Sequence, residues 1–154
     1  MQYVIKVALL VLVSIFTQIS FAAPAAPSGP SPIGTWQTYD LDGIARSYVR
    51  FSQSGGKLVG TIVKELNPAK GQAADPICTK CPAPWKGRKK VGITVVWGLQ
   101  KQGDKWVDGR VLDTDSGGVY RCQVSVSPDN RTLYLHAYVA VPILGKTVNW
   151  SRVK

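Results

Sequence analysis

The sequence predicts an all-β fold, an eight-stranded antiparallel up-and-down barrel. From residue 34 onward, apolar and polar side chains alternate with a period of two, and clusters of Gly, Asp, Asn and Ser interrupt the alternation at short intervals. Most connections are tight turns, which make neighbouring strands antiparallel. Eight such strands can close into a barrel that leaves no exposed sheet edge. A two-sheet β-sandwich is the alternative, because strand spacing alone does not separate the two arrangements.

Eight segments carry the alternation, and a long connection over residues 67–91 separates the third from the fourth. In chain order, the expected strands cover residues 34–40, 45–53, 57–66, 92–100, 105–113, 118–127, 132–140 and 146–153. Their apolar faces supply the candidate lining of a ligand cavity: Val49, Phe51, Leu58, Ile62, Val95, Trp97, Tyr120, Val124 and Leu135. The same side chains could instead fill a narrow barrel that has no cavity.

The first residues indicate export. An apolar run at residues 7–13 follows Lys6, and Ser20 and Ala22 are small residues at the spacing that a signal peptidase reads. We expect residues 1–22 to be a signal peptide and residues 23–32, rich in Pro and Ala, to be a disordered leader. Residues 33–154 would then form one barrel domain in a periplasmic or secreted protein, with no transmembrane segment in the mature chain.

The charge narrows the classes of partner. The chain has a formal net charge of +10, and an exported protein has little access to nucleic acid. A small amphipathic ligand or an anionic component of the cell envelope fits better. The charge is concentrated in a basic loop that carries Trp85, Lys86, Arg88, Lys89 and Lys90. Such a loop could also be a solvated surface that keeps the protein soluble.

The three cysteines allow one disulfide within the chain. Cys78 and Cys81 form a C-x-x-C followed at once by Pro82 and Pro84, which interrupt the helix that a thioredoxin-like redox site requires. Oxidation is expected outside the cytoplasm, so a local staple or unpaired loop thiols are favoured over redox chemistry. A zinc site would need Cys122 and His136 to join the pair. Because Cys122 falls on the apolar face of its strand, we expect a buried thiol and no metal site.

No pattern of catalytic residues is present. The sequence holds one histidine, His136, and neither G-x-S-x-G nor H-E-x-x-H. The stretch over residues 113–118, DTDSGG, superficially resembles a calcium loop, but Gly117 and Val124 occupy the positions where an EF-hand needs oxygen ligands. We interpret it as a hairpin turn and expect neither enzymatic activity nor a cofactor.

The two ends of the domain belong together in a closed barrel. Trp36 lies in a G-x-W at the start of the first strand, and Trp150 and Arg152 lie in the last strand, so a guanidinium could stack on an indole where the two strands pair. We expect structural roles for these three residues. This combination resembles the lipocalin pattern.

One family is more similar still. GTWQTYD, the C-x-x-C, WVDGRVLDTDSGGVYRC, LYLHAYV and LGKTVNWSRV follow one another as in a bacterial exported family catalogued as domain of unknown function twenty-one forty-seven, which is lipocalin-like in fold. The resemblance implies a small β-barrel and no established enzymatic activity, and it leaves the function open. The cationic KGRKK loop departs from the family pattern.

Two functions therefore compete. In the first, the barrel binds a small hydrophobic or amphipathic anionic ligand, with the basic loop near its opening. In the second, the barrel has a solid core and is an envelope scaffold, and Trp85 with the neighbouring cations docks a partner.

Overall fold

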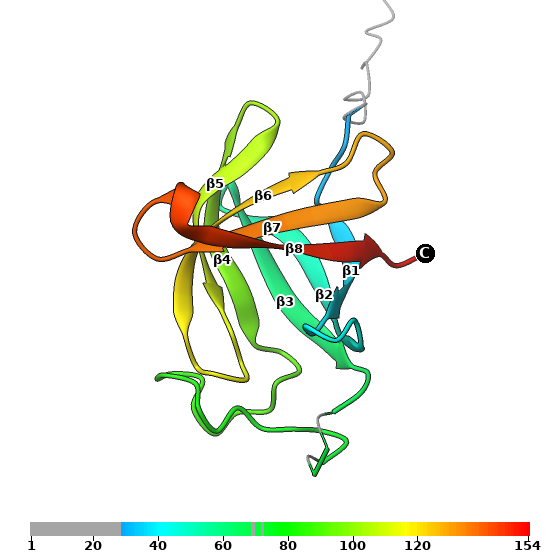
Figure 1. Ribbon diagram of the computed structural model, residues 1–154, viewed down its shortest axis with the longest axis vertical. Coiled ribbons are helices and arrows are strands. Elements are labelled where there is room, and N and C mark those ends of the chain that lie inside the picture. Colours follow the sequence, from blue (N-terminus) through cyan, green and yellow to red (C-terminus); the bar gives the residue numbers. More distant parts are fainter. Residues whose placement is uncertain (1–28, 69, 72) are drawn as a thin grey trace, which may run out of the picture.

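The computed structural model describes residues 29–68, 70–71 and 73–154, and these form a closed antiparallel barrel (Figure 1). The expected signal peptide, residues 1–22, and most of the expected leader lie outside the described residues. The strands are β1 (Gly34–Tyr39), β2 (Ala45–Ser54), β3 (Lys57–Glu65), β4 (Thr94–Gln102), β5 (Lys105–Leu112), β6 (Val119–Val126), β7 (Thr132–Tyr138) and β8 (Gly145–Arg152). Each strand pairs with the next along the chain, and β8 pairs with β1. The predicted barrel is confirmed over the sandwich.

The barrel closes through a short pairing of β1 with β8. Trp36 lies opposite Arg152, and the guanidinium sits 4.1 Å above the indole. The same guanidinium donates hydrogen bonds to the carbonyls of Ser31, Ile33 and Asn130 and to Oδ1 of Asn130. Trp36 is fully buried and donates its own indole N–H to the Pro32 carbonyl. Arg152 therefore joins the segment before β1 and the end of β8 to the turn between β6 and β7.

One half of the barrel is solid. Its largest side chains meet across the axis and exclude solvent; among the fully buried ones are Trp36, Phe51, Leu58, Leu99 and Leu133. Phe51 also packs against Trp150, with ring centroids 6.0 Å apart. Close packing of this kind leaves no room for a ligand at this level of the barrel.

The alternation of β4 is broken by two register shifts against β3, one between Leu58 and Gly60 and one between Gly60 and Thr61. Leu58 on β3 pairs with Leu99, but Gly60, two residues further along β3, pairs with Val96. Gly98 supplies the positive φ of +77° that this irregularity requires. As a result Val96 and Leu99 face inward, while Trp97 pairs with the exposed Arg110 and faces outward. The strict period of two wrongly placed Trp97 on the inner face.

The long connection between β3 and β4 folds back on itself. The Cys78 N–H bonds the Arg88 carbonyl, the Gly87 N–H bonds the Cys78 carbonyl, and the Lys90 N–H bonds the Pro76 carbonyl. Within this small hairpin Cys78 and Cys81 form a buried disulfide, as expected for a local staple. The hairpin lies over the outer wall of the barrel, where Trp85 covers Trp97 with ring centroids 5.1 Å apart.

The conformation of the connection between β7 and β8 was not predicted from the sequence. β7 ends at Tyr138, two residues earlier than expected, and Val139 to Leu144 form a projecting loop that includes a 3₁₀ helix at Pro142–Leu144. The loop stands out at the left of Figure 1 in orange and red. His136 holds its base, with Nε2 2.6 Å from the Pro142 carbonyl oxygen and Nδ1 2.8 Å from Thr147 Oγ1.

Candidate functional site: a pocket at the open end of the barrel

The other half of the barrel is hollow. A cavity of about 880 Å³ opens between the β1–β2 turn, the β5–β6 turn and the β7–β8 connection. This volume lies within the range of about 300–1,000 Å³ that small-molecule sites occupy. The barrel therefore combines a filled base with a pocket at its other end.

The deep wall of the pocket is apolar. Its aliphatic members come from six strands: Val49, Ile62, Val95, Val111, Leu112, Leu135, Ala137 and Val148. Trp150 also contributes, at the level where the solid half begins. These residues alternate with outward-facing ones, which is why a barrel of this pattern presents one continuous apolar surface inside.

Two hydroxyl side chains interrupt the apolar wall. Thr38 on β1 and Ser47 on β2 are both buried and line the pocket, with their oxygens 2.8 Å apart. The Thr38 hydroxyl also accepts the Ser47 N–H at 3.1 Å. The pair satisfies itself, and hydroxyls of this kind can rearrange to donate to or accept from a ligand.

Charged residues of both signs surround the opening. The cations on the pocket lining are Arg46, Lys90 and Lys146, and the acidic residues are Asp40, Asp42, Glu65, Asp113 and Asp115. Lys90 is buried and its Nζ lies 2.6 Å from Asp115, while Arg46 faces Asp40 at 3.9 Å. Charged side chains therefore surround the mouth of an apolar cavity.

Glu65 is a half-buried carboxylate among these charges. Burial raises the pKa of its carboxyl above the ordinary value, and Asp115 acts in the same direction. Lys90 and Arg46 oppose the shift of this pKa, but burial is the larger cause. Glu65 therefore gains a proton more readily than a fully solvated glutamate does.

The structure divides the nine predicted lining residues. Five line the pocket: Val49, Ile62, Val95, Tyr120 and Leu135. Phe51, Leu58 and Val124 do not, because they are buried at levels where side chains fill the barrel. Trp97 does not, because the two register shifts in β4 turn it outward against Trp85. The alternation identified inward faces correctly for eight of them, but it carries no information on depth along the axis.

The residues of the predicted basic loop differ in location and in partners. Lys90 lines the pocket and pairs with Asp115, while Lys89 pairs with Asp75 on the surface at 2.5 Å. Lys86 and Arg88 are exposed and do not line the pocket. Trp85 is half-buried and packs against Trp97 on the barrel wall, so one of its faces is already covered within the chain. The loop is thus not a single cationic tip.

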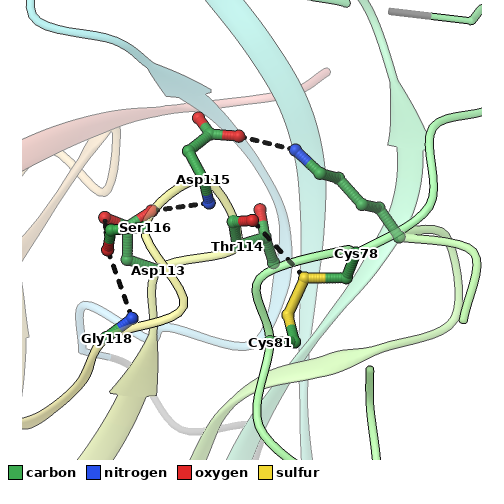
Figure 2. The surroundings of a disulfide bond; sticks show 8 residues. Cys78, Cys81, Asp113, Thr114, Asp115, Ser116 and Gly118 are labelled. Carbon is green, nitrogen blue, oxygen red and sulfur yellow. Dashed lines mark hydrogen bonds and ion pairs between the residues drawn. A yellow bond between two sulfur atoms is a disulfide. The ribbon is translucent and has the colours of Figure 1, made fainter. Parts of the chain in front are cut away.

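The disulfide faces the β5–β6 turn, which forms part of the pocket mouth (Figure 2). Cys78 Sγ lies 3.4 Å from the Thr114 carbonyl oxygen. Within the turn, Ser116 donates to Asp113 Oδ2 at 2.6 Å, and the Asp115 N–H bonds Asp113 Oδ1. These bonds agree with a hairpin turn, and they occupy the carboxylate of Asp113.

Cys122 and His136 do not join the cysteine pair. Cys122 is buried inside the barrel, and the two ring nitrogens of His136 bond Pro142 and Thr147. In the part of the chain that the structure describes, no cluster of three or more His, Cys, Asp or Glu side chains is arranged to hold a metal ion. No helix in that part is both long and apolar enough to cross a membrane.

Several pocket residues were missed by the sequence analysis. Thr38 and Ser47 are polar residues at inward positions of β1 and β2, and this departure from the apolar pattern is a signal that could have identified them. Arg46, Glu65 and Lys146 lie at strand ends, where the sequence does not tell which charges converge. Only the closed barrel brings these ends to one opening.

Fold and pocket together define a lipocalin-like barrel. In a comparison with solved structures, the chain is similar to a protein described as HP1028 of Helicobacter pylori, belonging to the lipocalin family, with 21% identity and a TM-score of 0.67 over 80% of this chain and 84% of that one. No curated protein matches. The model of a bacterial family described as uncharacterized protein conserved in bacteria (DUF2147) matches residues 34–152, and the chain belongs to this family.

Proposed function

We propose that the protein binds a small hydrophobic or amphipathic molecule, whose apolar part fills the hollow half of the barrel. The observation that carries the proposal is the 880 Å³ pocket with an apolar deep wall and a charged rim. Burying a ligand's apolar surface there contributes about 25 cal/mol per Å². Most of the affinity then comes from the apolar part of the ligand, and the charged residues at the mouth of the pocket select its polar head.

We propose an anionic head for this ligand. Lys90 and Arg46 lie on the rim, and each is already next to a carboxylate, Asp115 and Asp40 respectively. A carboxylate or phosphate head would share these cations, as charge-assisted hydrogen bonds favour. The more distant cations Lys86, Lys89 and Arg88 have no part in this contact.

We further propose that binding takes place outside the cytoplasm. The pattern of residues 1–22 supports this proposal, and so does the disulfide between Cys78 and Cys81, since such bonds persist in oxidising compartments. The mass of the protein recovered from the envelope of an expression host checks it. Cleavage after Ala22 is expected, and an uncleaved chain retained in the cytoplasm would contradict export.

Calorimetric titration of delipidated protein with a fatty acid, the fatty alcohol of equal chain length and the corresponding alkylamine tests the site. We expect the acid to bind most tightly at low ionic strength. Ala137→Trp, which fills the pocket from β7, should abolish binding of all three. Tyr134→Trp places the same indole ring on the same strand at an exposed position, and it should leave the affinities for all three ligands unchanged.

The titration separates the two parts of the proposal. Equal affinities for acid and alcohol, both lost in Ala137→Trp, would retain the apolar pocket and overturn the anionic head. Tighter binding of the amine would overturn it as well, because the acidic residues of the rim would then be the ones that select the head. Absence of binding, or binding that Ala137→Trp leaves intact, would overturn the pocket itself.

A further inference from the structure

Exposed aliphatic side chains are concentrated at the open end of the barrel. Six of them lie on two connections, the β1–β2 turn and the β7–β8 loop. We call this set the apolar rim: Leu41, Ile44, Val139, Val141, Ile143 and Leu144. Ile143 is 90% exposed and Leu41 is 83% exposed. Isolated exposed aliphatics are common on protein surfaces, but a contiguous group at one end marks an interaction site.

The apolar rim is continuous with the pocket. Leu41, Val139 and Leu144 line the cavity and are at the same time open to solvent. These three residues thus offer a molecule that leaves an apolar phase an apolar contact within the otherwise charged mouth of the pocket. The rim is placed where a ligand has to enter.

The β7–β8 loop is held in its projecting position. His136 bonds the Pro142 carbonyl through Nε2 and Thr147 through Nδ1, which ties the loop to the strands on either side of it. Residues 139–144 include no charged side chain, and the exposed Lys146 and Arg121 lie just behind them on β8 and β6. An uncharged tip backed by cations is the arrangement of segments that insert at a lipid interface.

We propose that the apolar rim docks the barrel on a membrane surface that contains anionic lipids, with Ile143 and Leu144 inserted among the acyl chains. The net charge of +10, or +9 without Lys6 of the expected signal peptide, favours such a surface and opposes association of two copies of the chain. A tip of a few aliphatic side chains is also far smaller than the roughly 800 Å² per partner that a stable protein interface needs. The inference draws its purpose from the proposed function, the uptake or delivery of a ligand, but its test does not depend on it.

Co-sedimentation with vesicles tests the proposal, using residues 23–154, which include every strand of the closed barrel. The vesicles are phosphatidylcholine alone or with one third phosphatidylglycerol. We expect the unaltered protein to bind the anionic vesicles. The double variant Ile143→Ser with Leu144→Ser should have a partition coefficient lower by a factor of about ten or more. Ile33→Ser, an exposed isoleucine before β1, is the matched control and should bind as the unaltered protein does.

Each other outcome contradicts docking through the rim. Absence of binding would do so, as would binding that is lost in high salt but unchanged in the double variant, because that pattern indicates attraction by surface charge alone. Sedimentation velocity of the same samples detects the remaining occupant: a dimer that the double variant dissociates, without vesicle binding, would assign the rim to a second copy. Ligand binding in the pocket is measured separately, so either proposal can fail alone.

Discussion

At the scale of single residues, two adjacent lysines show how burial decides the value of an ion pair. Lys89 and Lys90 each contact one carboxylate, at 2.5 Å and 2.6 Å. The Lys89 side chain is 71% exposed and that of Lys90 is 6% exposed. Exposed pairs contribute little because water and salt screen them, whereas a buried ammonium that loses its partner stays desolvated.

Because the two lysines differ in burial, replacing the aspartate partner of each by alanine should change stability by different amounts. Asp115→Ala should lower the free energy of unfolding by about 1–3 kcal/mol, because it leaves the buried Lys90 ammonium without its partner. Asp75→Ala, which removes the partner of Lys89, should leave the unfolding midpoint unchanged. Urea denaturation of the two variants measures both. Equal midpoints would contradict the structural role of the Lys90 pair.

Cys122 gives a prediction on pH dependence. Burial raises the pKa of its thiol from its ordinary 9.0 to about 12, and the nearby Arg110 opposes this shift only in part. Between these values the unfolded chain loses the thiol proton and the folded chain keeps it, so stability present below pH 9 is lost as pH rises, by about 1.4 kcal/mol per pH unit at most.

Thermal unfolding from pH 8 to pH 10.5 measures this loss. Cys122→Ala is the reference, because it shares every other titrating group with the unaltered protein. The unaltered protein should lose more stability than the variant across this range. Parallel curves for the two proteins would show that the thiol is not desolvated.

At the scale of elements, the disulfide hairpin and the β5–β6 turn form one wall of the pocket mouth. Cys78 Sγ touches the Thr114 carbonyl, and Lys90 at the end of the hairpin pairs with Asp115 on the turn. Gly117 allows the close approach, since a Cβ at this position would lie 2.0 Å from the Lys80 carbonyl oxygen. The shape of the mouth thus depends on two connections that are far apart in sequence.

Gly117→Ala should therefore push the disulfide hairpin away from the β5–β6 turn. Gly117 has a φ of +80° and Gly43 one of +77°, so alanine is strained by about 1–2 kcal/mol at either position. Nothing lies within 4 Å of a Cβ at Gly43, which makes Gly43→Ala a matched control for the overlap alone. We expect Gly117→Ala to cost more, by about 1 kcal/mol or more. Equal unfolding free energies would mean that the hairpin does not rest on the turn.

The elements also show what the sequence could predict. Alternation and turn residues located all eight strands, because a period of two and a Gly or Asp turn are local signals. The register shifts in β4 and the projecting loop at Pro142–Leu144 were missed, because strand pairing and the His136 bonds that fix them are not local. For the site, inward faces were predictable, but the depth of Phe51 and the convergence of Arg46 and Glu65 required the closed barrel.

At the scale of the whole molecule, the barrel is a filled base that supports a hollow end. The base is closed by Arg152, whose guanidinium lies on Trp36 and donates four hydrogen bonds. The pocket lies toward the opposite end, so the groups that stabilise closure and the groups that line the pocket are largely different. Stability and binding can therefore be altered separately.

Arg152→Ala should lower the free energy of unfolding by about 2–4 kcal/mol, because it leaves the partly buried Ser31 and Asn130 carbonyls without these donors and removes the cation from Trp36. Arg152→Lys keeps a cation over Trp36 but not the planar fork, so it should recover less than half of the loss. Arg50→Ala, at an exposed position on β2, is the control. Full recovery by lysine would contradict the hydrogen-bonding role of the guanidinium in closing the barrel.

The central claim is that a ligand occupies the hollow half of this barrel. Methyl NMR of the delipidated protein during titration with a fatty acid tests it most directly. The account predicts shift changes at Val49, Ile62, Val95 and Val148, which line the pocket, and none at Leu58, Leu99 and Leu133 in the solid half. Unchanged pocket methyls, or changes confined to the exposed Ile143 and Leu144, would contradict it.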